Sequence, residues 1–137
     1  MRDGRTRRIA TPEAAGEGSC RDYQARFKTC LVVLQGGAEG SEFEIEGERL
    51  VLGRGGRAEL RFEDDAMSQE HAALEFTGRG YRVRDLGSRN GTRLNGGEVR
   101  LAELKHGDRI QLGAHVLQLV VEPRRRGPRT YVIGEED

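Results

Sequence analysis

The chain has 137 residues, enough for one domain with short flanking segments. It carries 23 basic and 23 acidic residues, so a formal net charge of zero provides no bulk attraction to nucleic acid or anionic lipid. No run approaches the ~20 apolar residues that span a bilayer, and no apolar stretch follows the first arginines as in a signal peptide. We therefore expect a cytoplasmic protein with no nucleic-acid partner and no membrane partner.

The two cysteines, Cys20 and Cys30, do not form a disulfide framework or a zinc pattern. We expect two free thiols, with Cys30 in the core and Cys20 in a flexible arm, and neither a metal nor another cofactor. Twenty glycines beside three prolines indicate many tight turns.

The first part of the chain, residues 1–27, is polar and charged and lacks a repeating apolar period, which predicts a disordered N-terminal arm. Order is expected to begin near Lys28, because residues 30–34 have the composition of a buried strand. Beyond it, apolar and polar residues alternate with a period of two, as in half-buried strands. The alternating runs lie at 43–45, 50–52, 60–62, 72–76, 81–83, 110–112 and 117–121.

Glycine and asparagine turns separate these runs, and no segment has the pattern of a crossover helix. The sequence therefore predicts an all-β fold, an antiparallel β-sandwich of about ten or eleven short strands. The arginines after Pro123 mark the end of the fold. We expect an arm over 1–27, a sandwich domain over 28–122 and a flexible tail over 123–137.

Three short polar clusters interrupt the strand-like runs. They are Gly53-Arg54, Ser68-Gln69-Glu70-His71 and Ser88-Arg89-Asn90-Gly91-Thr92. Each cluster lies where one run ends or the next begins, so each is expected in a loop, where binding groups concentrate. An arginine, a hydroxyl and an asparagine amide presented together suit a doubly charged phosphate carried by a peptide.

In this order and with strand patterns between them, the clusters resemble the forkhead-associated (FHA) domain over about residues 29–122. The resemblance implies a β-sandwich that binds phosphothreonine peptides through functional loops at one end, without catalysis or cofactor. It also implies partner proteins phosphorylated by a Ser/Thr protein kinase. An alternative is a phosphate-independent adaptor that uses a sheet face for assembly. The oligomeric state is left open.

The resemblance assigns a role to each cluster. Arg54 is the main phosphate ligand, although an arginine after a turn glycine is also a common solvated residue. Ser68 donates its hydroxyl to phosphate or merely caps a turn. His71 is a buried strut that fixes the loop and does not contact phosphate. Asn90 pairs with the ligand backbone, whereas Asn90-Gly91 by itself indicates only a hairpin turn.

Two positions depart from the pattern of many relatives. Gln69 stands where they have arginine, and it keeps hydrogen-bonding capacity but adds no charge. Arg89 stands where they have threonine, and it either adds a second cation at the phosphate or points to solvent. The expected contacts with a phosphopeptide are Arg54, Ser68, Gln69, Arg89 and Asn90, with structural support from Gly53, His71 and Gly91.

Other interpretations of these motifs are less well supported. Ser68 and His71 could be a nucleophile and a base, but no orienting acid or oxyanion hole is recognisable, so we expect no enzyme and no catalytic residue. The glycines after Gly53 are not followed by the Gly-Lys-Ser/Thr of a nucleotide-binding loop.

Two threonines outside the predicted domain are possible phosphoacceptors. Thr11 follows Arg7-Arg8-Ile9-Ala10, which resembles the sites of arginine-directed kinases. Thr130 has Ile133 three residues later, a place at which domains of this family often select their ligand. Either threonine, once phosphorylated, would bind the site of its own chain or of a neighbour; alternatively, both stay unmodified.

Overall fold

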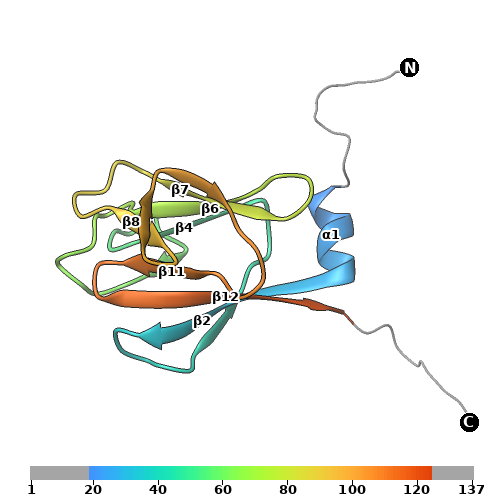
Figure 1. The fold of residues 1–137 in the computed structure, drawn as a ribbon, viewed down its shortest axis with the longest axis horizontal. Coiled ribbons are helices and arrows are strands. Elements are labelled where there is room, and N and C mark those ends of the chain that lie inside the picture. Colours follow the sequence, from blue (N-terminus) through green and yellow to red (C-terminus); the bar gives the residue numbers. More distant parts are fainter. Residues whose placement is uncertain (1–18, 125–137) are drawn as a thin grey trace, which may run out of the picture.

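A computed structural model describes residues 19–124, which form two packed β-sheets with a short helix at one end (Figure 1). The elements are α1 (Cys20–Arg26), β2 (Phe27–Gln35), β3 (Glu42–Glu44), β4 (Arg49–Gly53), β5 (Leu60–Arg61), β6 (Ala72–Phe76), β7 (Tyr81–Asp85), β8 (Thr92–Leu94), β9 (Gly97–Val99), β10 (Leu101–Glu103), β11 (Arg109–Leu112) and β12 (His115–Pro123). The predicted sandwich of ten or eleven strands is confirmed.

One sheet has five strands in the order β10-β7-β6-β4-β5, and the other has six in the order β3-β2-β12-β11-β8-β9. The strand pairs are antiparallel except β4 with β5, which is parallel. The β8–β9 hairpin turns at Asn95-Gly96, where both residues have positive φ. The core lies between the sheets and consists of the alternate inward residues of their strands, among them Leu31, Val33, Leu52, Leu74, Val83, Ile110, Leu117 and Leu119.

The prediction of a disordered arm is wrong for residues 20–27, because α1 and the start of β2 occupy them. Ser19 caps the helix by accepting a hydrogen bond from the Asp22 backbone N–H at 3.1 Å. A helix of seven residues is unstable in isolation, so it requires packing against the sandwich. Tyr23 supplies that packing, with its ring 5.0 Å from Phe27 and 5.4 Å from Phe76 between centroids.

The expectation of Cys20 in a flexible arm is also wrong, since only 6% of its surface is exposed. Its Sγ lies 3.6 Å from the hydroxyl of Tyr81, which in turn donates to the Gly47 carbonyl at 2.7 Å. Gln24 donates to the same hydroxyl at 2.8 Å. Burial first, and then the neighbouring thiol, raise the pKa of Tyr81 well above its ordinary range. Residues 1–18 and 125–137, with Thr11 and Thr130, lie outside the described part.

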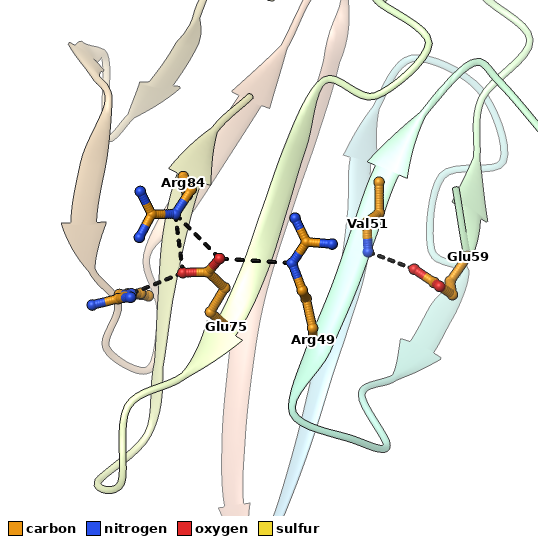
Figure 2. A network of polar contacts seen from close by, with 6 residues as sticks. Arg49, Val51, Glu59, Glu75 and Arg84 are labelled. Carbon is orange, nitrogen blue, oxygen red and sulfur yellow. Dashed lines mark hydrogen bonds and ion pairs between the residues drawn. The ribbon is translucent and has the colours of Figure 1, made fainter. Parts of the chain in front are cut away.

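The outer face of the five-stranded sheet is polar, and Figure 2 shows its central ion network. Glu75 on β6 accepts from the Nε atoms of Arg82 at 3.0 Å and Arg84 at 3.1 Å, and Arg49 lies 3.7 Å away. Although partial burial acts in the opposite direction, the hydrogen bonds from Arg82 and Arg84 lower the pKa of Glu75. Within residues 19–124 no helix is long and apolar enough to cross a membrane.

Strand register brings the three polar clusters to one end of the sandwich. Leu52 near the end of β4 is paired with Ala72 at the start of β6, and Ala72 is paired with Asp85 at the end of β7. The loop after β4, the loop before β6 and the loop after β7 therefore all leave the sheet at the same end of its strands. The helix α1 and the end of β12 lie at the opposite end of the molecule (Figure 1).

Candidate functional site

The candidate site consists of three loops, residues 54–59, 62–71 and 86–91, which are joined by direct hydrogen bonds. The Arg54 backbone N–H donates to the Ser68 carbonyl at 3.0 Å, and the Arg89 N–H donates to Ser68 Oγ at 2.9 Å. Asn90 Nδ2 donates to the Ala66 carbonyl at 2.6 Å. The structure therefore brings Arg54, Ser68 and Asn90 together on one rim.

Arg54 is the first residue after β4, and its side chain is partly exposed. Its Nε donates to the Met67 carbonyl at 3.0 Å, which fixes the direction of the guanidinium. Among residues 19–124, neither Nη group of Arg54 has an acceptor. Because the planar guanidinium has five N–H donors, the outer edge keeps a fork suited to two oxygens of one anion.

Gly53 permits the close approach of the first two loops. A Cβ at this position would lie 2.1 Å from the Gln69 carbonyl oxygen, far inside contact distance. The same carbonyl accepts from the Gly55 N–H at 3.0 Å. Any side chain at residue 53 would push the two loops apart and would displace the Arg54 and Ser68 backbones.

Ser68 links the second loop to the third. Its Oγ accepts from the Arg89 N–H, which leaves the hydroxyl proton for an incoming acceptor. Gln69 and Arg89 are both exposed at the same rim. Within the described ranges neither side chain has a hydrogen-bond or ion-pair partner, so both are available to a ligand and neither is required by the fold.

His71 is fully buried beneath the rim and connects the second and third loops. The Ser68 backbone N–H donates to its Nδ1 at 3.2 Å, so Nδ1 carries no proton. Nε2 must therefore carry the proton, and it donates to the Gly91 carbonyl at 2.8 Å. His71 is thus a neutral imidazole used entirely for bonds within the protein, and it has no free nitrogen for a ligand.

Asn90 uses one amide N–H to bond Ala66, and it keeps a second N–H and its carbonyl oxygen. That pair of groups matches the donor and acceptor of an extended peptide backbone. Gly91 follows with φ +84°, a left-handed conformation that favours glycine. The dipeptide lies in a loop between β7 and β8 and is not the tip of a two-residue hairpin.

Asp85, which our sequence analysis did not single out, organises the third loop. Its carboxylate accepts from the backbone N–H groups of Gly87 and Ser88, at 3.0 and 3.1 Å, and from the hydroxyls of Ser88 and Thr92. Partial burial raises its pKa, but these hydrogen bonds outweigh that effect and the pKa lies below its ordinary value. An aspartate two residues before a glycine is a turn signal that could have identified this role.

Two hollows border the rim. One hollow lies against Gly55, Arg57 and Gln69, and the other lies against Asn90 and Glu98. Among residues 19–124, no group of three His, Cys, Asp or Glu side chains is placed to hold a metal ion.

The comparisons with known proteins agree with this architecture. A family model described as the cytoplasmic domain of an inner membrane component of T3SS matches residues 32–123. The glycogen accumulation regulator GarA of Mycolicibacterium smegmatis is 33% identical over 119 residues, which cover 85% of this chain and 75% of that protein. An oxoglutarate dehydrogenase inhibitor of Corynebacterium jeikeium is 36% identical over 83 residues, which cover 61% of this chain and 58% of that protein.

Among solved structures, one from a study of phosphothreonine-dependent FHA domain interactions has a TM-score of 0.65 and 27% identity. The match covers 71% of this chain and 99% of that one. The extent of these matches, together with the observed sandwich, shows the family. The chain belongs to the forkhead-associated (FHA) domain family.

Proposed function

We propose that this protein is a phosphothreonine-binding signalling module that recruits or regulates partner proteins phosphorylated by a Ser/Thr kinase, and that it acts in the cytoplasm without catalysing a reaction. The observation that supports this most is the single rim shared by Arg54, Ser68 and Asn90. Each of these residues keeps an unused donor there while another of its groups is fixed by the fold.

Each of these groups has a distinct part in the proposed complex. The Nη fork of Arg54 grips two phosphate oxygens, and the Ser68 hydroxyl donates to the third oxygen. Arg89 adds a cation from the facing loop, and Gln69 adds a neutral donor. Asn90 holds the ligand backbone next to the phosphorylated residue through its free N–H and carbonyl. Gly53, His71 and Gly91 keep the loops in place but touch no phosphate.

The energetics favour moderate affinity. Phosphothreonine has about −1.5 to −2 charges at neutral pH, and each charge-assisted hydrogen bond contributes about 1.5–3 kcal/mol net. Ordering a flexible peptide opposes that gain. We therefore expect micromolar dissociation constants, which correspond to a binding free energy of about −8 kcal/mol. A preference for phosphothreonine over phosphoserine depends on one methyl group, so the two dissociation constants should differ by no more than about a hundredfold.

A phosphate-independent adaptor that uses a sheet face is the alternative. The outer face of the five-stranded sheet consists largely of mutually paired charges around Glu75, which is a common solvated surface. The rim, by contrast, keeps donors that have no partner in the part of the chain that the structure describes. That contrast favours phosphopeptide recognition.

An oriented library of phosphothreonine peptides, compared with the same library unphosphorylated, separates the two functions. We expect the phosphorylated library to be retained, with selection at positions flanking the phosphothreonine, and the unphosphorylated library to be lost. Equal retention of both libraries would support the adaptor and would contradict the proposal.

A further inference from the structure

β3 is an edge strand of the six-stranded sheet, and the segment around it is strongly acidic. Between residues 38 and 48 the chain has no basic residue, and it has five exposed glutamates, namely Glu39, Glu42, Glu44, Glu46 and Glu48. The whole chain is neutral. Negative charge is therefore concentrated at this edge, and the basic residues that balance it lie elsewhere in the sequence.

No strand within residues 19–124 pairs with the outer side of β3. Val33 donates to the Ser41 carbonyl at 2.9 Å, and Ile45 donates to the Thr29 carbonyl at 2.8 Å. Because inward and outward bonding alternates along an antiparallel strand, Glu42 and Glu44 direct their N–H and C=O groups away from the sheet. Such an edge is a template for an additional extended segment.

An apolar hollow lies beside the same edge. It has a volume of about 280 Å³, and its lining includes Val33, Phe43, Leu60, Phe62 and His115, together with the charged Arg61 and Glu63. Phe43 is 38% exposed, one of two large apolar side chains exposed in the described ranges. His115 Nε2 lies 3.0 Å from Asp64 Oδ2, at an angle that is poor for a hydrogen bond. The hollow offers contact to one or two apolar side chains.

The described chain ends beside the start of β2, and the side chain of its last residue, Arg124, reaches the acidic segment. Arg124 donates through its backbone N–H to the Arg26 carbonyl at 2.7 Å and through Nε to the Gln24 carbonyl at 2.9 Å. Its Nη2 lies 2.7 Å from Glu44 Oε2. Glu42 and Glu46 have no ion-pair partner among residues 19–124. The sequence that follows is basic and then apolar, with Arg125, Arg126 and Arg129 before Tyr131, Val132 and Ile133.

We propose that the acidic edge of β3 and the hollow beside Phe43 are the docking surface for residues 125–133 of the same chain. The three arginines complement Glu42, Glu44 and Glu46, and Tyr131 or Ile133 fills the hollow. This inference concerns a surface apart from the three loops and does not depend on phosphate binding.

The length of the segment suits this surface. The Arg124 backbone is bonded to Arg26, and the hollow begins at Val33, seven residues further along the chain on β2 and about 23 Å away. Seven residues separate Arg124 from Tyr131 and span at most about 25 Å. Tyr131 therefore reaches the hollow by following β3 closely, and Ile133 reaches it with about two residues of slack.

Edge glutamates have a simpler use, since charged side chains also protect edge strands from aggregation. That use requires only repulsion of other chains. It predicts exposed, unprotected amides at Glu42 and Glu44, whereas docking predicts protected ones. Amide exchange therefore distinguishes the two.

Hydrogen exchange in the full chain, followed by NMR at the Glu42 and Glu44 amides, tests the proposal. A short tether holds its segment at about millimolar effective concentration, so docking with an intrinsic Kd of about 0.1 mM slows exchange about tenfold. The triple variant R125E/R126E/R129E should remove this protection. The matched control R5E/R7E/R8E changes the net charge by the same amount and should leave the protection of these amides intact.

A compensating variant makes the test specific. Adding E42R/E46R to R125E/R126E/R129E should restore protection, and Tyr131→Ser should weaken it without any change of charge. The proposal is overturned if the wild-type amides exchange at unprotected rates, or if the tail variant leaves their exchange unchanged. Protection that grows with protein concentration would also overturn it, because the occupant would then be a second copy of the chain.

Discussion

Asp85 positions the third loop of the candidate site through hydrogen bonds made within the protein. It accepts four hydrogen bonds from Gly87, Ser88 and Thr92 and thereby shapes the turn that carries Arg89 and Asn90. Two of the four donors are backbone N–H groups. In a helix or strand such groups would bond to backbone carbonyls, and in this loop the Asp85 carboxylate accepts from them instead.

Asp85→Asn should lower the free energy of unfolding by about 1–3 kcal/mol at pH 7, because an amide is a weaker acceptor for these donors. The folded-state pKa of Asp85 lies below its ordinary value of 3.8. Its stabilisation is therefore complete above about pH 3.8 and is lost as the pH falls through the folded-state pKa. Urea unfolding of both proteins from pH 7 into acid should show the two stabilities converging, and a constant difference across that range would contradict the role.

Several groups at the rim could not be predicted from the residues alone. The carbonyls of Ala66 and Met67 hold Asn90 and Arg54, yet any residue type offers a carbonyl, so the sequence gives no signal for them. Arg54, Ser68 and Asn90 could be proposed from the sequence, because their side chains have the chemistry that a phosphate and a peptide backbone require. Their availability to a ligand was not predictable, since it depends on which donors the fold already uses.

At the scale of elements, the meeting of three loops depends on the paired ends of β4, β6 and β7 and on the close approach at Gly53. Apolar patterning predicted these strands, although only β7 alternates in burial and β4 and β6 each bury three consecutive residues. The helix α1 was missed although Cys20, Tyr23 and Phe27 have helical spacing. A seven-residue helix depends on tertiary packing, which local pattern does not reveal.

Gly53→Ala should disrupt the rim because its Cβ would lie 2.1 Å from the Gln69 carbonyl. We expect a loss of about 1–3 kcal/mol in unfolding free energy and at least about a tenfold loss in phosphopeptide affinity. Gly56→Ala is a matched control, because a Cβ at that position meets nothing within 4 Å. Thermal melts and calorimetric titrations of the two variants check this prediction, which fails if Gly53→Ala and Gly56→Ala behave alike.

At the scale of the whole molecule, the site and the described chain ends lie at opposite ends of the sandwich (Figure 1). β12 runs nine residues from His115, beside Asp64, to Pro123, so Arg124 is about 30 Å from the loop that carries Ser68. Thr130 lies six residues beyond Arg124 and reaches at most about 21 Å. Thr11 lies eight residues before Ser19 and reaches at most about 28 Å.

Phosphorylated Thr130 should therefore occupy the site of a second copy and not its own. We expect protein phosphorylated at Thr130 to self-associate with increasing concentration in analytical ultracentrifugation, and the Arg54→Ala form to stay monomeric. Mass spectrometry after treatment with a Ser/Thr kinase establishes whether Thr11 or Thr130 is modified. A phosphorylated monomer whose site is blocked to added phosphopeptide would contradict the geometric argument.

Isothermal titration calorimetry with one phosphothreonine peptide selected from the library tests the central claim most directly, using wild type, Arg54→Ala and Arg57→Ala. Both arginines lie in the same loop, but only Arg54 is fixed toward the rim by Met67. We predict micromolar binding by wild type and Arg57→Ala, and at least about a tenfold loss for Arg54→Ala with an unchanged melting temperature. Normal binding by a folded Arg54→Ala protein would contradict the account.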